Sequence, residues 1–412
     1  MKPLALAKRL GNDPPMTQEM RQTATRIFTA GVAAADPFTG VQGALPDTAP
    51  ALILSVGKAA RRMAEAALDR FAGVPTIVVT NAENASPLEG ATVITAGHPV
   101  PDEGGAAGAR AFIEAIQSTT GPVLVLVSGG GSALLPAPAG DITLDDKAEV
   151  SRLLLASGAD IRTMNLLRQQ LSLIKGGGLA RLCAGRDLRA LILSDVVGDD
   201  LSTIASGPTV APLGTRADAI AVLERLNIWD RVAQSVRDWL TRSDADQPIA
   251  EAQNILIGSN AQSVAAMAAE AGVAHVIPTA IEGDVADAAR EICDAAGEGI
   301  TIWGGETTVT LKGTGRGGRN QELALRIAIE AQARGWTNWA CLQGGSDGRD
   351  GPTDAAGGLV DDGTLARIAA AGGDLATLLD NNDSYAALGL AGDLLMTGGT
   401  GTNVADLGVL FR

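Results

Sequence analysis

Short runs of Val, Ile and Leu recur along the first half of the chain, and each precedes a glycine or polar turn and then a helical pattern. The runs are "ALILSV", "TIVVT", "ATVIT", "PVLVLV" and "LRALIL". Near-continuous hydrophobicity is typical of parallel strands that are buried on both faces, and strands that alternate with helices form α/β folds. The pattern therefore predicts a parallel sheet covered by helices.

The apolar pattern is interrupted between residues 240 and 252 by the polar text "TRSDADQPIAEA". A break of this kind is typical of a linker, so we predict one domain over residues 1–245 and a second over residues 250–412. The second domain begins with the run "QNILIG" and ends with "ADLGVLF". Its segment "TTVTL" alternates apolar residues with Thr, which favours a mixed sheet in a smaller α/β domain.

Composition supports two layered α/β domains. The chain has 412 residues, more than a typical single core accommodates, and it combines 3% aromatic residues with 51 glycines. Small side chains must therefore pack closely, as they do in layered α/β folds. The net charge of −15 argues against nucleic acid as the main partner, because binding a polyanion requires clustered cations.

The cysteines and the apolar runs indicate a cytoplasmic protein without membrane association. Cys183, Cys293 and Cys341 are scattered and lack the spacing of a zinc site or a disulfide framework. The N-terminal text "MKPLALAKRL" has no long apolar stretch, and no run approaches 18 consecutive apolar residues. We therefore expect neither a signal peptide nor a membrane span.

Glycines and a lysine follow two of the predicted strands. In open α/β sheets, ligands bind beyond the carboxyl ends of the strands, and glycines let backbone N–H groups approach an anion. Lys58 follows the first strand, and we expect it to contact a phosphate or a carboxylate rather than lie on the solvated surface. A tight turn is an equally good interpretation of the glycine run. Its residues are Ser128, Gly129, Gly130, Gly131 and Ser132.

The segment "RTMNLLRQQLSLIKGGGLA" adds three polar candidates for binding a substrate or a phosphate. They are Asn165, Arg168 and Lys175. Arg168 and Lys175 are seven residues apart and would share one face of a helix. A solvated helix face is an equally good interpretation.

Acidic residues also follow predicted strands. Asp195, Glu306 and Asp347 are hard oxygen ligands of the kind that Mg²⁺ accepts alongside water and phosphate, so we predict them as metal ligands. Some of them would otherwise cap helices or form turns. For Asp354, in a proline-containing loop, a turn is as good an interpretation as a ligand.

The stretch "GTGRGGRNQE" at residues 313–322 precedes a helical pattern. We predict that Gly315 and Gly317 bring backbone N–H groups to an anion and that Arg319, at the helix start, adds its guanidinium. The alternative to ligand binding is that Arg319 forms an ion pair with Glu322 on the surface. The stretch also matches G-x-G-x-x-G, but no acidic residue ends a following strand as the ribose contact of a dinucleotide site requires.

Two other motifs are weak or missing. "GGSDG" matches the nucleophile elbow around Ser346, but such a serine needs a histidine base, and the chain has only His98 and His275. A P-loop is excluded because no G-x-x-x-x-G-K-[ST] exists in the chain. Cationic side chains, glycine turns and acids beyond strand ends are together the parts of a phosphoryl-transfer site. These parts do not identify the acceptor.

Several blocks, taken together, resemble the glycerate kinases of the MOFRL type. They are "LSVGKAA", "AGHPVPDEGG", "LVSGGGSALLPAPAG", "MNLLRQQLSLIKGGGLA", "LILSDVVGDDLSTIASGPT", "GGETTVTLKGTGRGGRNQELAL" and "GGSDGRDGPTDAAGG". The resemblance implies a Rossmann-like N-terminal domain, a smaller C-terminal α/β domain and a site in the cleft between them. It implies that ATP with Mg²⁺ phosphorylates D-glycerate, usually at the 2-hydroxyl. It also implies catalytic roles for Lys58 and Arg319.

Two alternatives remain at this point. Many members of this family are labelled hydroxypyruvate reductase, which would require NAD(P)H, and a non-enzymatic sensor of glycerate or nucleotide is a third class. A sensor does not need charged residues from two domains at one site. The sequence leaves open the 2- or 3-hydroxyl, the nucleotide, the substrate range and the oligomeric state, a homodimer included.

Overall fold

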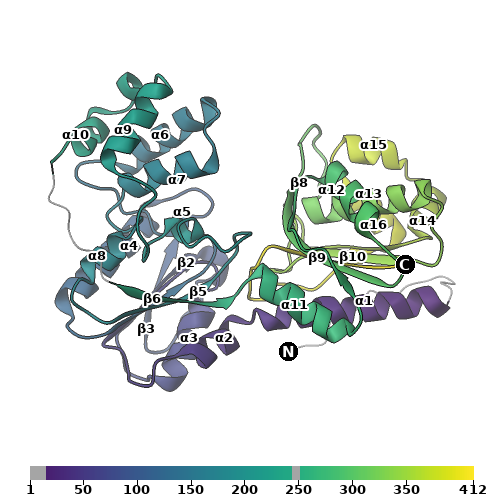
Figure 1. Ribbon diagram of the computed structural model, residues 1–412, viewed down its shortest axis with the longest axis horizontal. Helices are drawn as coiled ribbons and strands as arrows, with labels where there is room; N and C mark the ends of the chain where they lie inside the picture. Colours follow the sequence, from purple (N-terminus) through teal and green to yellow (C-terminus); the bar gives the residue numbers. More distant parts are fainter. Residues whose placement is uncertain (1–14, 244–250) are drawn as a thin grey trace. The chain divides into compact units, whose positions relative to one another are not determined.

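The computed structural model describes residues 15–243 and 251–412, which form two compact units (Figure 1). We call Pro37–Ile257 the Rossmann-type unit. We call Gly258–Arg412, together with the described part of the first 36 residues, the mixed-sheet unit. The boundary expected between residues 245 and 250, like the segment "MKPLALAKRL", lies outside the described residues. The units differ from the expected domains because the first described helix packs with the C-terminal part of the chain.

The Rossmann-type unit is built on a six-stranded sheet of order β3-β2-β1-β4-β5-β6. The pairs formed among β1 to β5 are parallel, as the apolar runs predict. "QNILIG" was expected to open the second domain, but it forms β6 at the edge of this first sheet. The strands are β1 (Leu52–Val56), β2 (Thr76–Asn81), β3 (Ala91–Ala96), β4 (Val123–Val127), β5 (Leu188–Leu193) and β6 (Ala252–Gly258).

This strand order places the topological switch point between β1 and β4. In open α/β sheets, ligands bind beyond the carboxyl ends of the two strands at this point. The helices next to the sheet are α2 (Pro37–Ala44), α3 (Ala60–Arg70), α4 (Glu103–Ser118), α5 (Gly131–Leu134) and α8 (Gly178–Leu182). Both faces of β1 and β4 are buried, which explains their uninterrupted apolar runs.

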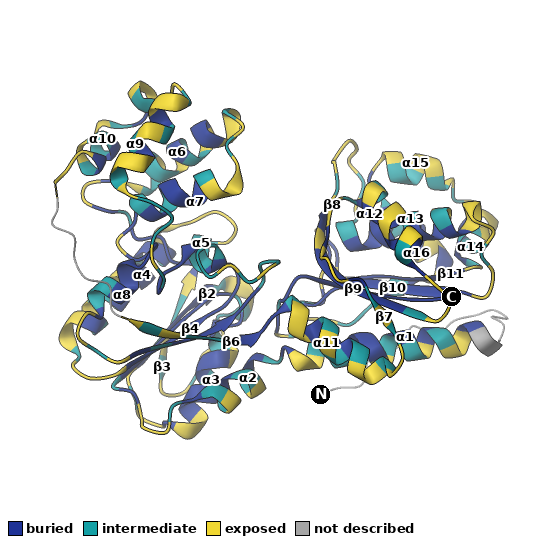
Figure 2. Ribbon diagram, viewed as in Figure 1, coloured by how far each residue is buried: buried dark blue, intermediate teal, exposed yellow. Residues whose placement is uncertain are grey.

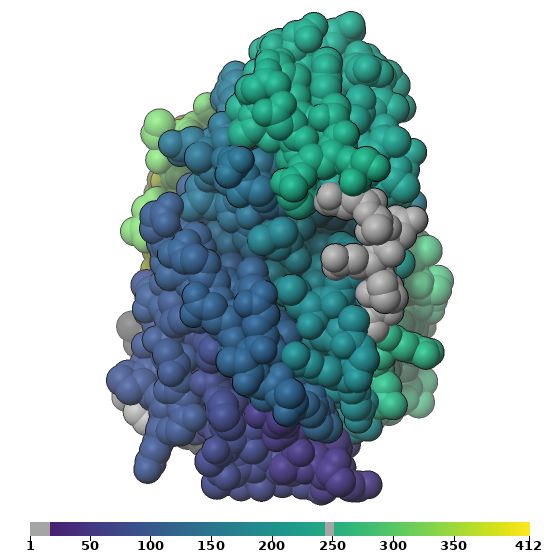
Figure 3. Space-filling view, turned by 90° about the vertical axis from the view of Figure 1, so that its left-hand side faces the viewer, coloured from purple at the N-terminus to yellow at the C-terminus, as the bar shows by residue number. Residues whose placement is uncertain are grey.

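Four further helices of the Rossmann-type unit form a helical layer with its own core. They are α6 (Leu144–Ala156), α7 (Ile161–Gln170), α9 (Arg216–Arg225) and α10 (Gln234–Leu240), and Figure 3 shows them at the surface of this unit. Leu153, Leu167 and Leu223 are buried in this core. Thr143 begins α6 with a reciprocal pair of hydrogen bonds to Asp146, which satisfies N–H groups that the helix leaves free.

The mixed-sheet unit contains seven strands, in the order β12-β11-β10-β13-β9-β7 with β8 paired to β9. β13 runs antiparallel to both β9 and β10, while β7 and β8 run parallel to β9, so the expected mixed sheet is confirmed. Only Thr307 and Thr308 of "TTVTL" lie in a strand, at the end of β9. The strands are β7 (His275–Val276), β8 (Ile281–Asp284), β9 (Ile300–Thr308), β10 (Ala340–Gly345), β11 (Gly357–Asp361), β12 (Leu394–Leu395) and β13 (Asp406–Phe411).

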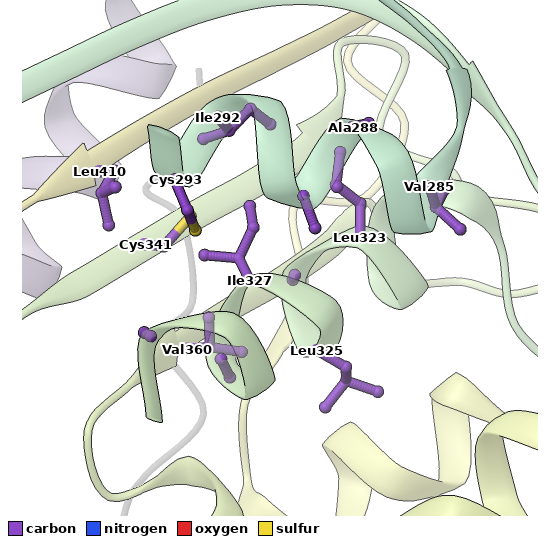
Figure 4. Packing of buried hydrophobic residues seen from close by; sticks show 14 of the residues in the cluster. Val285, Ala288, Ile292, Cys293, Leu323, Leu325, Ile327, Cys341, Val360 and Leu410 are labelled. Atoms are coloured by element: carbon purple, nitrogen blue, oxygen red, sulfur yellow. The ribbon is translucent and has the colours of Figure 1, made fainter. Parts of the chain in front are cut away.

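Helices cover both faces of this mixed sheet. One face packs against α12 (Val285–Ala295), α13 (Arg319–Ala333) and α16 (Ser384–Ala391), and Figure 4 shows Ile327 of α13 pointing toward α12. The other face packs against α1 (Pro15–Ala34) and α11 (Asn260–Ala271). Successive strand residues alternate between the two cores: Cys341 belongs to the first and Leu342 to the second. The remaining helices are α14 (Thr364–Ala370) and α15 (Leu375–Asp380).

Burial explains why α1 belongs to the mixed-sheet unit. Ile27 and Phe28 of α1 are almost completely buried in the core that also contains Met267 and Leu342. Figure 2 shows the buried side of α1 next to α11 and the exposed side facing solvent. No helix among the described residues is long and apolar enough to cross a membrane. The three cysteines are free and buried, as expected for a chain without a disulfide framework.

Candidate functional site

The loops that follow β1 and β4 are hydrogen-bonded to each other at the switch point. The N–H of Lys58 donates to the carbonyl of Gly129 at 2.9 Å, and the N–H of Ala59 donates to the hydroxyl of Ser128 at 3.1 Å. Gly57, in the left-handed region at φ +124°, leaves no room for a side chain because a Cβ would collide with Ser128. The predicted lysine and the predicted glycine run are therefore parts of one local structure.

Asp195, which follows β5, lies against the same glycine turn. A Cβ at Gly129 would collide with the carboxylate of Asp195, so this approach requires glycine. Burial raises the pKa of Asp195, and hydrogen bonding within its own residue, the nearby charge of Lys58 and the N–H of Gly130 oppose that rise. The Rossmann-type unit thus brings Lys58, the glycine run and Asp195 together, as the strand-end rule predicts.

His98 is a member of this group that the sequence analysis considered only as a base for Ser346. A Cβ at Gly130 would contact both His98 and Lys58, so the two side chains border the same turn. Burial and then the charge of Lys58 lower the pKa of His98, which favours the neutral imidazole. The strand-end rule could have indicated His98, because it follows the end of β3 by two residues in the sequence "TAGHPV".

Of the three candidates in the segment after α6, Lys175 contacts the end of the glycine run, whereas Arg168 and Asn165 contact each other. The ammonium of Lys175, which is 3% exposed, donates to the carbonyl of Ser132 at 2.9 Å. The half-buried Arg168 donates to the side-chain oxygen of the buried Asn165 at 3.4 Å. Burial, followed by the charges of Lys147 and Arg168, holds the pKa of Lys175 well below its usual value. Lys147 was not predicted.

Arg319 begins α13, as predicted, but its guanidinium is bound by carboxylates of its own unit. It forms two hydrogen bonds with Asp406, at 2.6 and 3.1 Å, and a salt bridge with Glu306 at 3.2 Å. The alternative partner Glu322 instead pairs with Arg326 at 2.6 Å. The alternative that Arg319 forms a surface ion pair with Glu322 is therefore wrong.

The N-terminal N–H groups of α13 are also occupied by an acid. The N–H groups of Asn320 and Gln321 donate to the carboxylate of Asp350 at 3.1 and 2.8 Å. Burial raises the pKa of Asp350 to about 6, although these two hydrogen bonds favour its charged form. The anion that we expected a ligand to supply at this helix end is thus supplied by the protein.

The glycines before α13 pack against the segment that leads into α16. The N–H of Gly315 donates to the carbonyl of Asn381 at 2.8 Å, and a Cβ at Gly317 would collide with Ser384. Close packing explains both glycines, and their contact with a ligand anion stays a prediction. Ser346 is fully buried with its hydroxyl accepting from the N–H of Val404, which does not suit an exposed nucleophile.

The three predicted metal ligands are divided between the units, with Asp195 in one and Glu306 and Asp347 in the other. Among the described residues, no group of three or more His, Cys, Asp or Glu side chains is arranged to hold a metal ion. Mg²⁺ needs only one or two carboxylates when phosphates and water complete its shell. Asp195 and Asp347 each remain open to such an ion, because neither forms a salt bridge within the described residues, whereas Glu306 is bound to Arg319. Asp354 accepts from the hydroxyl of Tyr385, a structural role.

The fold and the site define an α/β protein with Rossmann-type strand order and a lysine-lined glycine turn at the switch point. Residues 23–241 match a domain of unknown function, DUF4147, and residues 299–406 match the MOFRL family. The chain is 36% identical to the glycerate 2-kinase of Pyrococcus horikoshii over 95% of this chain and 97% of that protein. It is 40% identical to a putative hydroxypyruvate reductase of Agrobacterium vitis over 94% and 93%.

A crystal structure of glycerate kinase from Thermotoga maritima has the same fold, with a TM-score of 0.88 at 35% identity, covering 96% of this chain and 99% of that one. Since the similarity extends over nearly the whole length of these relatives, the chain belongs to the glycerate kinase family that joins DUF4147 to MOFRL. The resemblance expected from the sequence motifs is confirmed.

Proposed function

We propose that this protein is a kinase that transfers the γ-phosphoryl group of ATP to the 2-hydroxyl of D-glycerate and produces 2-phosphoglycerate. The observation that carries the proposal is the bond between Lys58 and the glycine run at the switch point, where an α/β sheet binds anionic ligands. The relatives from Pyrococcus and Thermotoga, named glycerate 2-kinase and D-glycerate 2-kinase, support this activity.

The residues of the Rossmann-type unit have the following proposed roles. The ammonium of Lys58 neutralises phosphate charge, and the run Ser128–Ser132 lets the ligand approach the backbone closely. Asp195 is the proposed acceptor for the proton of the substrate hydroxyl or a ligand of Mg²⁺, because it is a half-buried carboxylate without a salt bridge next to that run. Phosphoryl transfer depends mainly on such positioning and charge neutralisation.

The mixed-sheet unit contributes Arg319 and Asp347 in this proposal. The guanidinium of Arg319 is held in one orientation by Asp406 and Glu306, while about a third of its side chain remains exposed. An oriented guanidinium can stabilise the charge of the transferring phosphoryl group. The expectation that residues of both units act on one substrate stays a prediction.

Mg²⁺ is part of the proposal, with Asp195 or Asp347 as the carboxylate that would hold it. When bound, the ion neutralises charge on the β- and γ-phosphates. Asp347 is half-buried, and one of its oxygens accepts from the N–H of Arg349, which fixes the direction of the carboxylate.

A hydroxypyruvate reductase is the second candidate, because the Agrobacterium relative carries that name and the strand order is that of many dinucleotide-binding sheets. The one formal fingerprint, at residues 313–318, speaks against it. A dinucleotide motif offers the N–H groups of its helix to a pyrophosphate, and here Asp350 accepts those bonds.

One experiment decides between these functions. The purified protein is incubated with D-glycerate, ATP and Mg²⁺, and the phosphoglycerate isomer is identified by ³¹P NMR. A parallel reaction with hydroxypyruvate and NADH or NADPH is followed by absorbance. We expect 2-phosphoglycerate and no reduction. Rapid reduction without ADP release would replace the kinase by the reductase, and ligand binding without either turnover would support the sensor.

Variants of two lysines sharpen this experiment. We expect Lys58→Met to lower kcat/KM at least a hundredfold, because an unneutralised phosphate loses a charge-assisted contact of about 3 kcal/mol. Lys312 is an exposed lysine of the mixed-sheet unit, and Lys312→Met serves as the matched control, expected within twofold of wild type. A folded Lys58→Met protein with wild-type kinetics would contradict the assigned role.

A further inference from the structure

Three cations from α6, α7 and the segment after α7 lie near one another, and one of them, Lys175, is bonded to the glycine run. We call Lys147, Arg168 and Lys175 the cation cluster. Lys147 lies in the first turn of α6, Arg168 in the last turn of α7, and Lys175 seven residues further on. Their positive charges act on one another, since Arg168 lowers the pKa of both lysines and Lys147 lowers that of Lys175. The sequence analysis did not predict this cluster, because Lys147 is in α6 and Arg168 is in α7, 21 residues further along the chain.

Neutral oxygen atoms are the hydrogen-bond acceptors of this cluster. The ammonium of Lys147 donates to the carbonyl of Leu171 at 3.1 Å, and that of Lys175 donates to the carbonyl of Ser132 at 2.9 Å. Arg168 reaches the amide oxygen of Asn165 at 3.4 Å. An ammonium has three N–H donors and a guanidinium has five, so each group has donors left over.

No carboxylate neutralises the cluster within the described residues, although the chain has a net charge of −15. Of the neighbouring acids of α6, Asp146 binds Thr143 and Ser235, Glu149 binds Arg152, and Asp145 is exposed. Burial lowers the pKa of Lys147 to about 8 and that of Lys175 well below its usual value. Desolvated cations without a counter-charge destabilise a fold, and a bound anion would relieve that cost.

We propose that the cation cluster is the subsite for the carboxylate of the hydroxy-acid substrate, with Lys147 as a binding residue. The inference rests on the proposed kinase function, whose two substrates bring a polyphosphate and a carboxylate. Lys58 and the glycine turn suit the polyphosphate, because both lie at the switch point. Arg168 suits a carboxylate, which a planar guanidinium binds through two parallel hydrogen bonds.

The position of Lys175 connects this subsite to the reaction. Lys175 is bonded to Ser132, the last residue of the glycine run, and the loop that contains Lys58 is bonded to Gly129 of the same run. A carboxylate at the cluster would place the neighbouring hydroxyl of a 2-hydroxy acid within one or two bonds of the anchored group. The subsite would thereby select acids over neutral alcohols and hold the hydroxyl at a fixed depth.

The test compares D-glycerate with glyceramide, in which an uncharged amide replaces the carboxylate. For Lys147→Met we expect the KM for D-glycerate to rise about 10- to 100-fold, the size of one charge-assisted hydrogen bond, with kcat changed less than threefold. The KM for ATP and the inhibition constant of glyceramide should change less than threefold. Lys147→Arg keeps the charge and should recover at least a third of the wild-type affinity.

Arg152→Met is the matched control, because Arg152 is also a cation of α6 but forms an exposed pair with Glu149. It should behave like wild type in every assay, and melting temperatures check that each variant is folded. An equal loss of affinity for glycerate and glyceramide would overturn the proposal, and so would a rise in the KM for ATP alone, which would assign the cluster to phosphate. Thermal stabilisation of the Lys147 variants by D-lactate, a carboxylate ligand independent of turnover, should be weaker than that of wild type even if the protein proves not to be a kinase.

Discussion

Mutation can separate the structural role of Arg319 from the catalytic role proposed for it. Its guanidinium neutralises Asp406, which is 3% exposed, and it is the proposed cation for the transferring phosphoryl group. Arg319→Ala would leave Asp406 buried and unpaired, so we expect a loss of about 3 to 5 kcal/mol in the free energy of unfolding as well as a loss of activity. Arg319→Lys keeps a charge but lacks the planar fork that binds both oxygens of Asp406.

The decisive measurement is therefore kcat for Arg319→Lys at a temperature where denaturant titration shows the variant to be folded. We expect kcat to fall on the order of 10³-fold, the usual contribution of an arginine that stabilises phosphoryl charge. Arg326→Lys, which alters another guanidinium of α13 bound to Glu322, is the control. A folded Arg319→Lys enzyme within tenfold of wild type would mean that Arg319 only supports the fold.

Asp350 should make stability depend on pH between about 4 and 6. Its pKa is raised from 3.8 to about 6 in the folded protein, mainly by burial, so the folded state binds its proton more tightly than the unfolded state. Stability from this group is fully present below pH 4 and is lost as the pH rises through 6, a change on the order of 3 kcal/mol. We expect Asp350→Asn to remove this component.

The measurement is the free energy of unfolding of wild type and Asp350→Asn at several pH values from 4 to 7. The difference between the two proteins should move in favour of the variant as the pH rises. Asp354→Asn is a useful control, because Asp354 is exposed and its pKa is lowered by Tyr385, so any slope should have the opposite sign. Parallel curves for wild type and Asp350→Asn would contradict the predicted role.

The strand-end rule located Lys58, Asp195 and the glycine run because the parallel strands of an open sheet deliver their loops to one edge. It could not show that Asp350 occupies the start of α13. Asp350 follows the end of β10 by five residues, and nothing in the neighbouring sequence indicates which helix its carboxylate binds. Which acid binds a given helix start is decided by the tertiary fold. The sequence analysis therefore expected a ligand anion after "GTGRGG", where the N–H groups of α13 in fact bind Asp350.

At the scale of elements, the loop after β5 holds the glycine run in place. Ala205, Ser206 and Gly207 are consecutive left-handed residues, and the hydroxyl of Ser206 bonds that of Ser132 at 2.8 Å. Gln169 of α7 donates to the carbonyls of Ser202 and Ser206 at 3.0 and 3.3 Å. Strain of this kind persists only when surrounding bonds determine it, and it is common at functional sites.

We therefore expect Gln169→Leu to impair both stability and turnover. The change removes the side-chain partner of the Ser202 carbonyl and of the Leu213 N–H, which costs about 1 to 3 kcal/mol per group, and it releases the loop that supports Ser132. The free energy of unfolding and kcat/KM should both fall, the latter at least tenfold. Gln170→Leu removes a single bond to the carbonyl of Gly214 and is the matched control. Equal effects of the two variants on kcat/KM would count against a positioning role for Gln169.

The strands were predictable where burial on both faces produces an uninterrupted apolar run, as in β1 and β4. β11 was missed because "GGLVD" begins with two glycines that pack against neighbouring groups, a feature without a strand-like pattern. β6 was predicted as a strand but placed in the wrong sheet. The sheet that a strand joins depends on which sheet edge is free in the folded protein. Nothing in the sequence "QNILIG" indicates that it pairs with β5.

At the scale of the whole molecule, the mixed-sheet unit is built from both ends of the described chain. Arg21 of α1 forms ion pairs with Asp361 of β11 and with Asp393, and all three side chains are at most 7% exposed. The second acid also accepts from Arg367 at 2.7 Å. A contact across more than 300 residues has no local signal, so the division of the sequence near residue 245 assigned α1 to the wrong neighbour.

Arg21→Met should therefore destabilise the mixed-sheet unit. Without the guanidinium, two buried carboxylates lose a partner, which we expect to cost about 3 to 5 kcal/mol. Hydrogen exchange measured by mass spectrometry should show faster exchange in α1, β11 and β13 and little change in β1 and β4, because those strands belong to the other unit. Arg26→Met is the matched control: Arg26 lies on the same helix, but its pair with Glu270 is exposed, so the loss should stay below about 1 kcal/mol. Equal exchange in the two variants, or faster exchange confined to the Rossmann-type unit, would show that α1 does not depend on Arg21 for its place in the fold.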